Sequence, residues 1–218
     1  MMPAWAMRLL SWIWPITVER TEGAFGPLQL RWEYGRLALN TPNANQSFGS
    51  LHRVWQHVLR EELGSPPPRN VLALGLGGGS VVHILRKELR LGMPITIVEL
   101  DPVMVNLART RFELDTMKDV RVITGDATIQ VHALQERFDL VLVDLFEDLD
   151  MARGIDSRAF VQGLRERCAE GGKVCFNTVG HDARSKRRCD KIKDLLCDAF
   201  DNVREWRTED LNRVFVAA

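Results

Sequence analysis

The chain has 218 residues and a mass of 24.8 kDa, which is the size of one ordinary domain with a small appendage. Its 29 lysines and arginines balance 29 aspartates and glutamates, so the formal net charge is zero, which disfavours nucleic acid and anionic membranes as default partners. The proportions of 45% hydrophobic and 27% charged residues exclude a disordered chain.

The first 18 residues are apolar, with Arg8 as their only charged residue. This stretch is too short to span a bilayer, Pro15 interrupts it, and it lacks the basic start and the cleavage site of a signal peptide. We therefore expect a cytoplasmic protein with no membrane contact. We expect Trp5, Trp12 and Trp14 to pack on the domain or on a second subunit.

The front of the chain alternates like strands over residues 16–20, 28–32 and 36–40, with glycines and a proline between them. These stretches predict a small antiparallel β unit, which we place with the N-terminal segment in residues 1–47. Helical spacing follows over 48–63, and three prolines then form a stiff connector. Residues 48–218 are expected to form the main domain.

After the connector, strands and helices alternate over about 150 residues, which predicts a mostly parallel sheet with helices on both faces. The expected strands cover 71–75, 94–99, 120–123, 138–143, 173–177, 203–207 and 213–217. The expected helices cover 79–91, 101–114, 157–171 and 185–200.

A glycine-rich loop follows the first buried strand and opens a helix; it contains Gly75, Gly77, Gly78, Gly79 and Ser80. Glycines at this place let the backbone turn sharply and approach a ligand, although a tight strand-to-helix turn needs them too. Glu99 ends the next strand, where a carboxylate can accept two hydrogen bonds from a ribose diol. Its alternative role is to cap the following helix, which Asp101 fits better.

Two more carboxylates follow the next two strands. Asp126 stands before Ala127 and can accept an adenine amino proton, with Ala127 leaving room for the ring, or it can cap the helix that follows. Asp144 ends the strand over 138–143, at the edge where open α/β sheets bind ligands, and can orient a group or take a proton. The sequence thus predicts a nucleoside site at this edge of the sheet, with Asp144 beside it.

We do not expect a metal or a disulfide. The five histidines show no ligand spacing, and the four cysteines form no Cys-x-x-Cys pair, so they are expected to be reduced thiols. A basic run near residues 184–193 has helical spacing and is interpreted as a solvated face, with an RNA-contacting patch as its alternative.

These motifs resemble the spermidine synthase family within the class I S-adenosylmethionine-dependent methyltransferase superfamily. The resemblance is carried by the stretches 71–80, 97–102, 125–127 and 138–144, and it extends to 39–47, where the family places a nucleoside-contacting glutamine, here Gln46. It implies a seven-stranded Rossmann-like sheet with a small N-terminal β unit, a homodimer, and a small-molecule substrate. It also implies ribose binding by Glu99, adenine binding by Asp126 and catalysis by Asp144.

The chain departs from that family where the aminopropyl donor and the diamine would bind. Polyamine-forming members carry an aspartate after the three glycines, and this chain has Ser80. Leu51, His52 and Trp55 stand where the family holds the diamine. A carboxylate about 4 Å from an ammonium contributes roughly 4 kcal/mol before desolvation, so its loss weakens an aminopropyl donor. The same change removes repulsion of the carboxylate of S-adenosylmethionine.

The sequence therefore predicts a transferase that binds S-adenosylmethionine or its decarboxylated form, with methyl transfer slightly favoured over aminopropyl transfer and the acceptor unknown. The alternatives are a polyamine aminopropyltransferase and a nucleoside-binding homologue without catalysis. A nicotinamide-dependent dehydrogenase also fits the glycines and Glu99, but that function gives no role to Asp126.

Overall fold

The computed structural model describes residues 2–43, 47, 49–208 and 211–218. Its helical elements are α1 (Ala4–Leu10), α2 (Gly49–Glu62), α3 (Ser80–His83), the π-helical turn η1 (Ile84–Glu88), α4 (Pro102–Arg111), the 3-10 turn η2 (Leu114–Thr116), α5 (Ala127–Ala133), α6 (Arg158–Arg167) and α7 (Ala183–Ala199). Its strands are β1 (Ile16–Gly23), β2 (Gly26–Glu33), β3 (Arg36–Asn40), β4 (Val71–Leu74), β5 (Ile95–Glu99), β6 (Val120–Thr124), β7 (Phe138–Val143), β8 (Phe146–Glu147), β9 (Asp150–Met151), β10 (Cys168–Val179), β11 (Val203–Thr208) and β12 (Asn212–Ala217).

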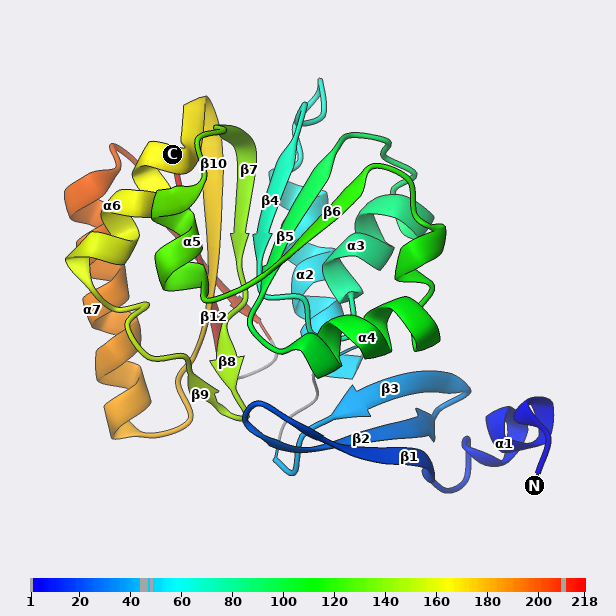
Figure 1. Ribbon diagram of the computed structural model, residues 1–218. Helices are drawn as coiled ribbons and strands as arrows, with labels where there is room; N and C mark the ends of the chain where they lie inside the picture. The colour runs from blue at the N-terminus through cyan, green and yellow to red at the C-terminus, as the bar shows by residue number, and fades with distance from the viewer. Residues whose placement is uncertain (1, 44–46, 48, 209–210) are drawn as a thin grey trace.

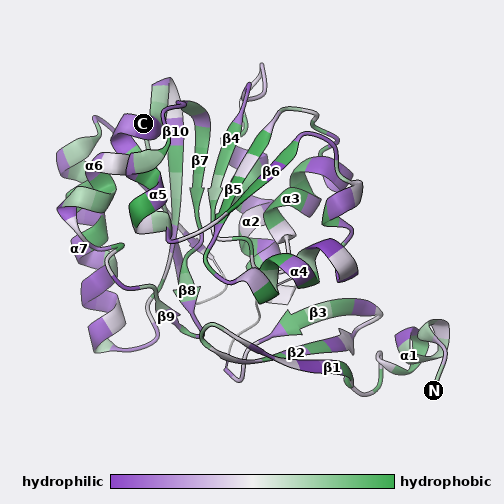
Figure 2. Ribbon diagram, in the orientation of Figure 1, coloured by the Kyte–Doolittle hydropathy of each residue, from purple (hydrophilic) through white to green (hydrophobic). Residues whose placement is uncertain are grey.

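The main sheet has seven strands among the described residues, in the order β11-β12-β10-β7-β4-β5-β6. The five strands from β10 to β6 are parallel, and β12 runs antiparallel to both β10 and β11. Helices α5, α6 and α7 cover one face and α2, α3 and α4 cover the other (Figure 1). Strands covered on both faces are mostly apolar, as Figure 2 shows for β4; β7 is apolar except at Asp139. The predicted α/β fold is confirmed.

A second, three-stranded antiparallel sheet, β1-β2-β3, lies at the end of the main sheet where β4 and β5 finish (Figure 1). Leu28, Leu30 and Leu39 on this sheet pack with Met104 and Leu107 of α4. The sequence predicts this three-stranded sheet. The small apolar core packs it against α4, at the edge of the main sheet where the glycine loop lies.

The structure differs from the predicted elements at several places. The helix expected over 157–171 ends at Arg167, and β10 begins directly after it because Cys168 already pairs with Phe138. Gly171 has a positive φ of 70° and lies in an irregularity of this strand instead of at a helix end. The helix expected over 79–91 divides into α3 and η1. Helix α1 and the two-residue strands β8 and β9 are too short to show a period in the sequence.

Helix α1 is attached to the β2–β3 turn through Ser11, whose buried hydroxyl accepts a hydrogen bond from the Gly35 amide at 2.9 Å. Trp5, Trp12 and Trp14 remain 64–74% exposed, and Trp12 contacts the β2–β3 turn, with its ring edge-on to that of Tyr34 at 6.4 Å between centroids. Their packing on a second subunit stays a prediction. Along the part of the chain that the structure covers, none of the helices combines the length and the apolar character needed to cross a bilayer.

Candidate functional site

The glycine loop is shaped by contacts that only a residue without a side chain permits. Gly75 has a φ of 96°, and a Cβ atom there would lie 2.1 Å from the carbonyl oxygen of Asp144. Gly79, at a φ of 83°, is the residue before the first turn of α3. These conformations bring the ends of β4 and β7 together and direct the loop across the carboxyl edge of the sheet.

Glu99 ties the glycine loop to the start of α4. Its Oε2 accepts a hydrogen bond from the Leu76 amide and its Oε1 accepts one from the Asp101 amide, both at 2.9 Å. Burial raises the pKa of Glu99, and the backbone N–H groups only partly oppose this effect. Each carboxylate oxygen has a second lone pair, so these bonds leave Glu99 able to accept hydroxyl protons as well.

Asp101 and Asp126 both act as helix caps, as the sequence predicts for Asp101 and as the alternative interpretation of Asp126 predicts. Asp101 Oδ1 accepts the Val103 amide of α4 at 2.8 Å, and Asp126 Oδ1 accepts both the amide and the hydroxyl of Thr128. Both of these bonds are accepted by Oδ1 of Asp126, and among the described residues its Oδ2 has no hydrogen-bond partner. Asp126 also lines the same cavity as Glu99, so capping and ligand contact are compatible at this residue.

Asp144 is held by two neutral donors. Asn177 Nδ2 of β10 donates to its Oδ1, and Trp55 Nε1 of α2 donates to its Oδ2, each at 2.9 Å. Burial raises the pKa of Asp144 despite these two hydrogen bonds. Asn177 is itself oriented by Asn212, whose Nδ2 donates to the Asn177 side-chain oxygen at 3.0 Å.

Sequence reasoning placed Trp55 near an acceptor pocket but did not find its hydrogen bond to Asp144, and it missed Asn177 altogether. The available signal for Asn177 was a polar side chain directly after the apolar run at 174–176. His52, which sequence reasoning also placed near the acceptor, contacts Glu88.

The carboxylates and the loop meet in a cavity of about 250 Å³ at the carboxyl edge of the parallel strands. Gly75, Gly77, Ala127 and Asp144 line it together with Glu99 and Asp126. Phe25, from the turn of the front sheet, forms part of its wall. The remaining lining residues are Val98, Leu100, Asp101, Met104, Thr128, Leu145, Phe146, Glu147, Ala152, Arg153 and Ile155.

Other predicted site residues do not line this cavity in the described part of the chain. Gly78 packs closely against Ser47: a Cβ atom added to Gly78 would lie 2.2 Å from the Cβ atom of Ser47. Gly79 and Ser80 belong to the start of α3, where Ser80 is buried. The predicted nucleoside contact Gln46 lies outside the described residues.

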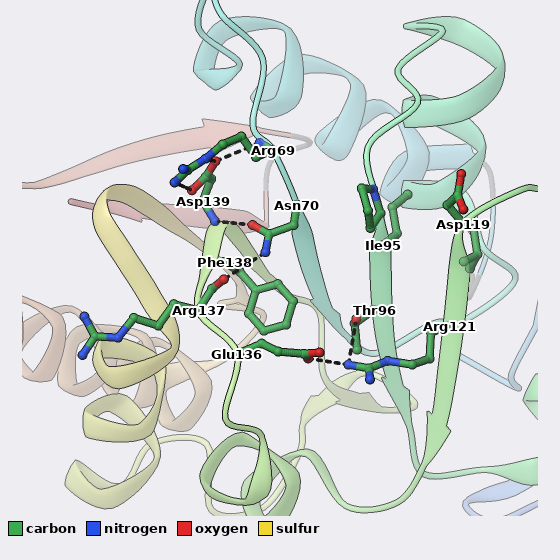
Figure 3. A pocket seen from close by; sticks show the side chains of 12 residues that line it. Arg69, Asn70, Ile95, Thr96, Asp119, Arg121, Glu136, Arg137, Phe138 and Asp139 are labelled. Atoms are coloured by element: carbon green, nitrogen blue, oxygen red, sulfur yellow. Dashed lines mark hydrogen bonds and ion pairs between the residues drawn. The ribbon is translucent and has the colours of Figure 1, made fainter.

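A larger hollow of about 740 Å³ lies at the opposite edge of the sheet, where the parallel strands begin (Figure 3). Four of its charged side chains form two ion pairs: Arg69 makes two side-chain hydrogen bonds to Asp139 at 2.8 Å, and Arg121 pairs with Glu136. Ligands of open α/β sheets bind at the carboxyl ends of the strands, so the smaller cavity is the better candidate site.

The chain is similar to proteins of known family. Residues 52–204 match the family model described as the spermine/spermidine synthase domain. A polyamine aminopropyltransferase from Vibrio vulnificus (strain CMCP6) is 31% identical over 119 residues, which are 53% of this chain and 40% of that protein. An eEF1A lysine and N-terminal methyltransferase homolog from Drosophila melanogaster is 29% identical over 69% of this chain and 23% of that protein. The chain therefore spans less than half the length of these two relatives.

Solved structures share the fold. The spermidine synthase from Thermotoga maritima superposes with a TM-score of 0.74 at 13% identity, over 93% of this chain and 72% of that one. Human methyltransferase-like protein 13, solved in complex with SAH, gives a TM-score of 0.62 at 20% identity, over 78% of this chain and 82% of that one.

Proposed function

Because the chain belongs to the spermine/spermidine synthase family, we propose that it is a transferase that binds an S-adenosylmethionine-type nucleoside. The observation that carries this proposal is the convergence of three carboxylates from the ends of three parallel strands. Glu99 after β5, Asp126 after β6 and Asp144 after β7 line one cavity together with the glycine loop.

The local geometry gives each carboxylate a separate task in this proposal. Glu99 uses the lone pairs that the Leu76 and Asp101 amides leave over to accept the two ribose hydroxyls. Asp126 uses Oδ2 to accept an adenine amino proton, because its Oδ1 is engaged by Thr128. The small side chain of Ala127 leaves space for the ring.

The proposed reaction is an in-line attack of a nucleophile on a carbon bound to the sulfonium. The new bond forms as the carbon–sulfur bond breaks, the electron pair of that bond goes to sulfur, and the nucleophile gives up a proton. The electrophile is already activated, so the protein supplies mainly proximity and alignment. Asp144, held by Trp55 and Asn177, orients the nucleophile or accepts its proton.

Methyl transfer is slightly favoured over aminopropyl transfer. Ser80 adds no carboxylate for the ammonium of the decarboxylated donor, and Trp55 is fully buried beside Asp144 where the family holds a diamine. The relatives named above include proteins of both activities, so polyamine aminopropyl transfer is the second candidate.

Calorimetric titration tests both the nucleoside and the donor. The ligands are S-adenosylmethionine, its decarboxylated form, methylthioadenosine and a nicotinamide dinucleotide. We expect S-adenosylmethionine to bind more tightly than the decarboxylated form and the dinucleotide not to bind. Tighter binding of the decarboxylated form, with turnover on putrescine, would establish aminopropyl transfer instead. Failure of all the adenosine compounds to bind would overturn the proposed function.

A further inference from the structure

A second group of chemically active side chains lies outside the candidate cavity, between α2 and the consecutive elements α3 and η1. His52 Nε2 is 2.7 Å from Glu88 Oε1, and His83 Nδ1 is 3.8 Å from the same oxygen. One ligand atom from each of these three residues lies within 4.8 Å of the others. The arrangement was not predicted from sequence because His52 belongs to a different helix.

The π-helical turn is what brings His83 and Glu88 together. Residues five positions apart point about 140° away from each other on a regular α-helix. Here the Leu89 amide donates to the Ile84 carbonyl oxygen five residues earlier at 2.9 Å, so the turn is wider and returns Glu88 to the side of His83. Single π-helical turns are rare and occur frequently at functional sites.

Glu88 is also oriented as a ligand would be. Gln56 Nε2 donates to its Oε2 at 2.7 Å, which leaves Oε1 directed at the two imidazoles. Such outer hydrogen bonds to ligand carboxylates are a regular part of protein metal sites. The arginine Arg60 lies 3.7 Å from Oε2 and adds a positive charge, so a cation here would favour an anionic ligand from solvent.

Solvent has access to this group. Gln56, His83 and Glu88 line a cavity of about 660 Å³ that also contains Arg36 and Arg111. The side chains of His83 and Glu88 are 36% and 22% exposed, whereas that of His52 is 3% exposed. The three donors therefore occupy one side of the site and the cavity provides the other.

We propose that His52, His83 and Glu88 form a binding site for a divalent transition-metal ion, with Zn²⁺ as the expected metal. Two imidazoles and one carboxylate suit zinc better than magnesium or calcium, which prefer oxygen ligands. The fourth position faces the cavity and is filled by a solvent ligand. The ion would join α2 to η1, and α2 also carries Trp55, so it would stabilise the helix that positions Asp144.

The test uses the full chain after treatment with a chelator and removal of the chelator. Co²⁺ is titrated as a spectroscopic probe, and its visible absorption reports a four- or five-coordinate ion; Zn²⁺ is then added in competition. We expect one Co²⁺ per chain, displaced by Zn²⁺. His83→Gln and Glu88→Gln should each lower the Co²⁺ affinity at least ~10-fold, the loss that even outer partners of a metal ligand produce.

Matched controls separate this site from adventitious binding. His57→Gln removes an exposed histidine from the same helix, and Cys197→Ser removes the exposed thiol; both should bind Co²⁺ like the unmodified chain. Zn²⁺ should also raise the melting temperature of the unmodified chain but not that of His83→Gln. The melting temperature of His83→Gln without metal shows whether this variant is folded. The absence of stoichiometric binding, equal affinity in Glu88→Gln, or loss of binding in Cys197→Ser would overturn the proposal. None of these results depends on the transferase activity.

Discussion

Replacing Glu99 by glutamine separates the two tasks that the structure gives to this carboxylate. Both oxygens accept backbone N–H groups, from Leu76 and Asp101. The amide nitrogen of glutamine cannot accept, so one of these backbone donors loses its partner, which costs about 1–3 kcal/mol of unfolding free energy. For a chain of this size we expect the melting temperature to fall by roughly 2–4 °C per kcal/mol.

The same change should weaken nucleoside binding separately. Hydrogen bonds to a charged group contribute about 1.5–3 kcal/mol, so loss of the ribose contacts should lower the affinity for S-adenosylhomocysteine roughly 10- to 100-fold. Calorimetry on the folded variant measures this loss, and thermal unfolding without ligand measures the structural cost. Glu147→Gln is the matched control, because it removes a negative charge from the same cavity without touching Leu76. Unchanged affinity in Glu99→Gln, or an equal loss in the control, would refute the ribose-binding role.

Three further predictions follow from the site and from the far edge of the sheet. Asp144→Asn should lower turnover about 100-fold or more while leaving nucleoside affinity within a few-fold. Because burial raises the pKa of Asp144, the acidic limb of the pH–rate profile of the unmodified chain should lie at a higher pH than an ordinary aspartate would give, and this limb should be absent from the variant. Gly75→Ala should cost about 3 kcal/mol of unfolding free energy in urea titrations, because it combines a φ of 96° with a clash, whereas Gly79→Ala has a similar φ and open space and should cost clearly less. Burial acts to raise the pKa of Glu205, but hydrogen bonds from Arg213 and its neighbours lower it to about 2. The stabilisation from Glu205 is therefore complete above pH 4.5 and lost as the pH falls towards 2. Glu205→Gln should lower the unfolding free energy by ~1 kcal/mol at pH 7 but not at pH 2. An equal decrease at both pH values would contradict this reasoning.

The order of strands and helices could be predicted because each element has its own period or its own boundary residues. The run Val71–Leu74 is apolar on both faces, and Asp101 followed by Pro102 marks the start of α4. The end of α6 could not be placed because glycines at 171 and 172 are compatible with a helix end and with a strand irregularity. Pairing of Cys168 with Phe138 decides between them, and this contact is not local.

The carboxylates of the candidate site were predictable for a similar reason. Glu99 ends β5, Asp126 comes shortly after β6 and Asp144 directly after β7, and parallel strands finish at a common edge. Contacts that join distant segments were not predictable. The bond from Trp55 to Asp144 spans 89 residues, and that from His52 to Glu88 spans 36, so neither spacing shows a pattern in the sequence.

The carboxylate of Asp101 has a consequence for how the candidate cavity opens. One of its oxygens starts α4, and the other accepts the amide of Ala24, in the β1–β2 turn beside Phe25, at 2.8 Å. This hydrogen bond joins the tip of the β1–β2 hairpin, which carries Phe25 of the cavity wall, to the residue that starts α4, so opening of the bond would loosen that part of the wall. Deuterium uptake at the Ala24 amide would report how often this happens, and an occupant trapped underneath should slow the uptake.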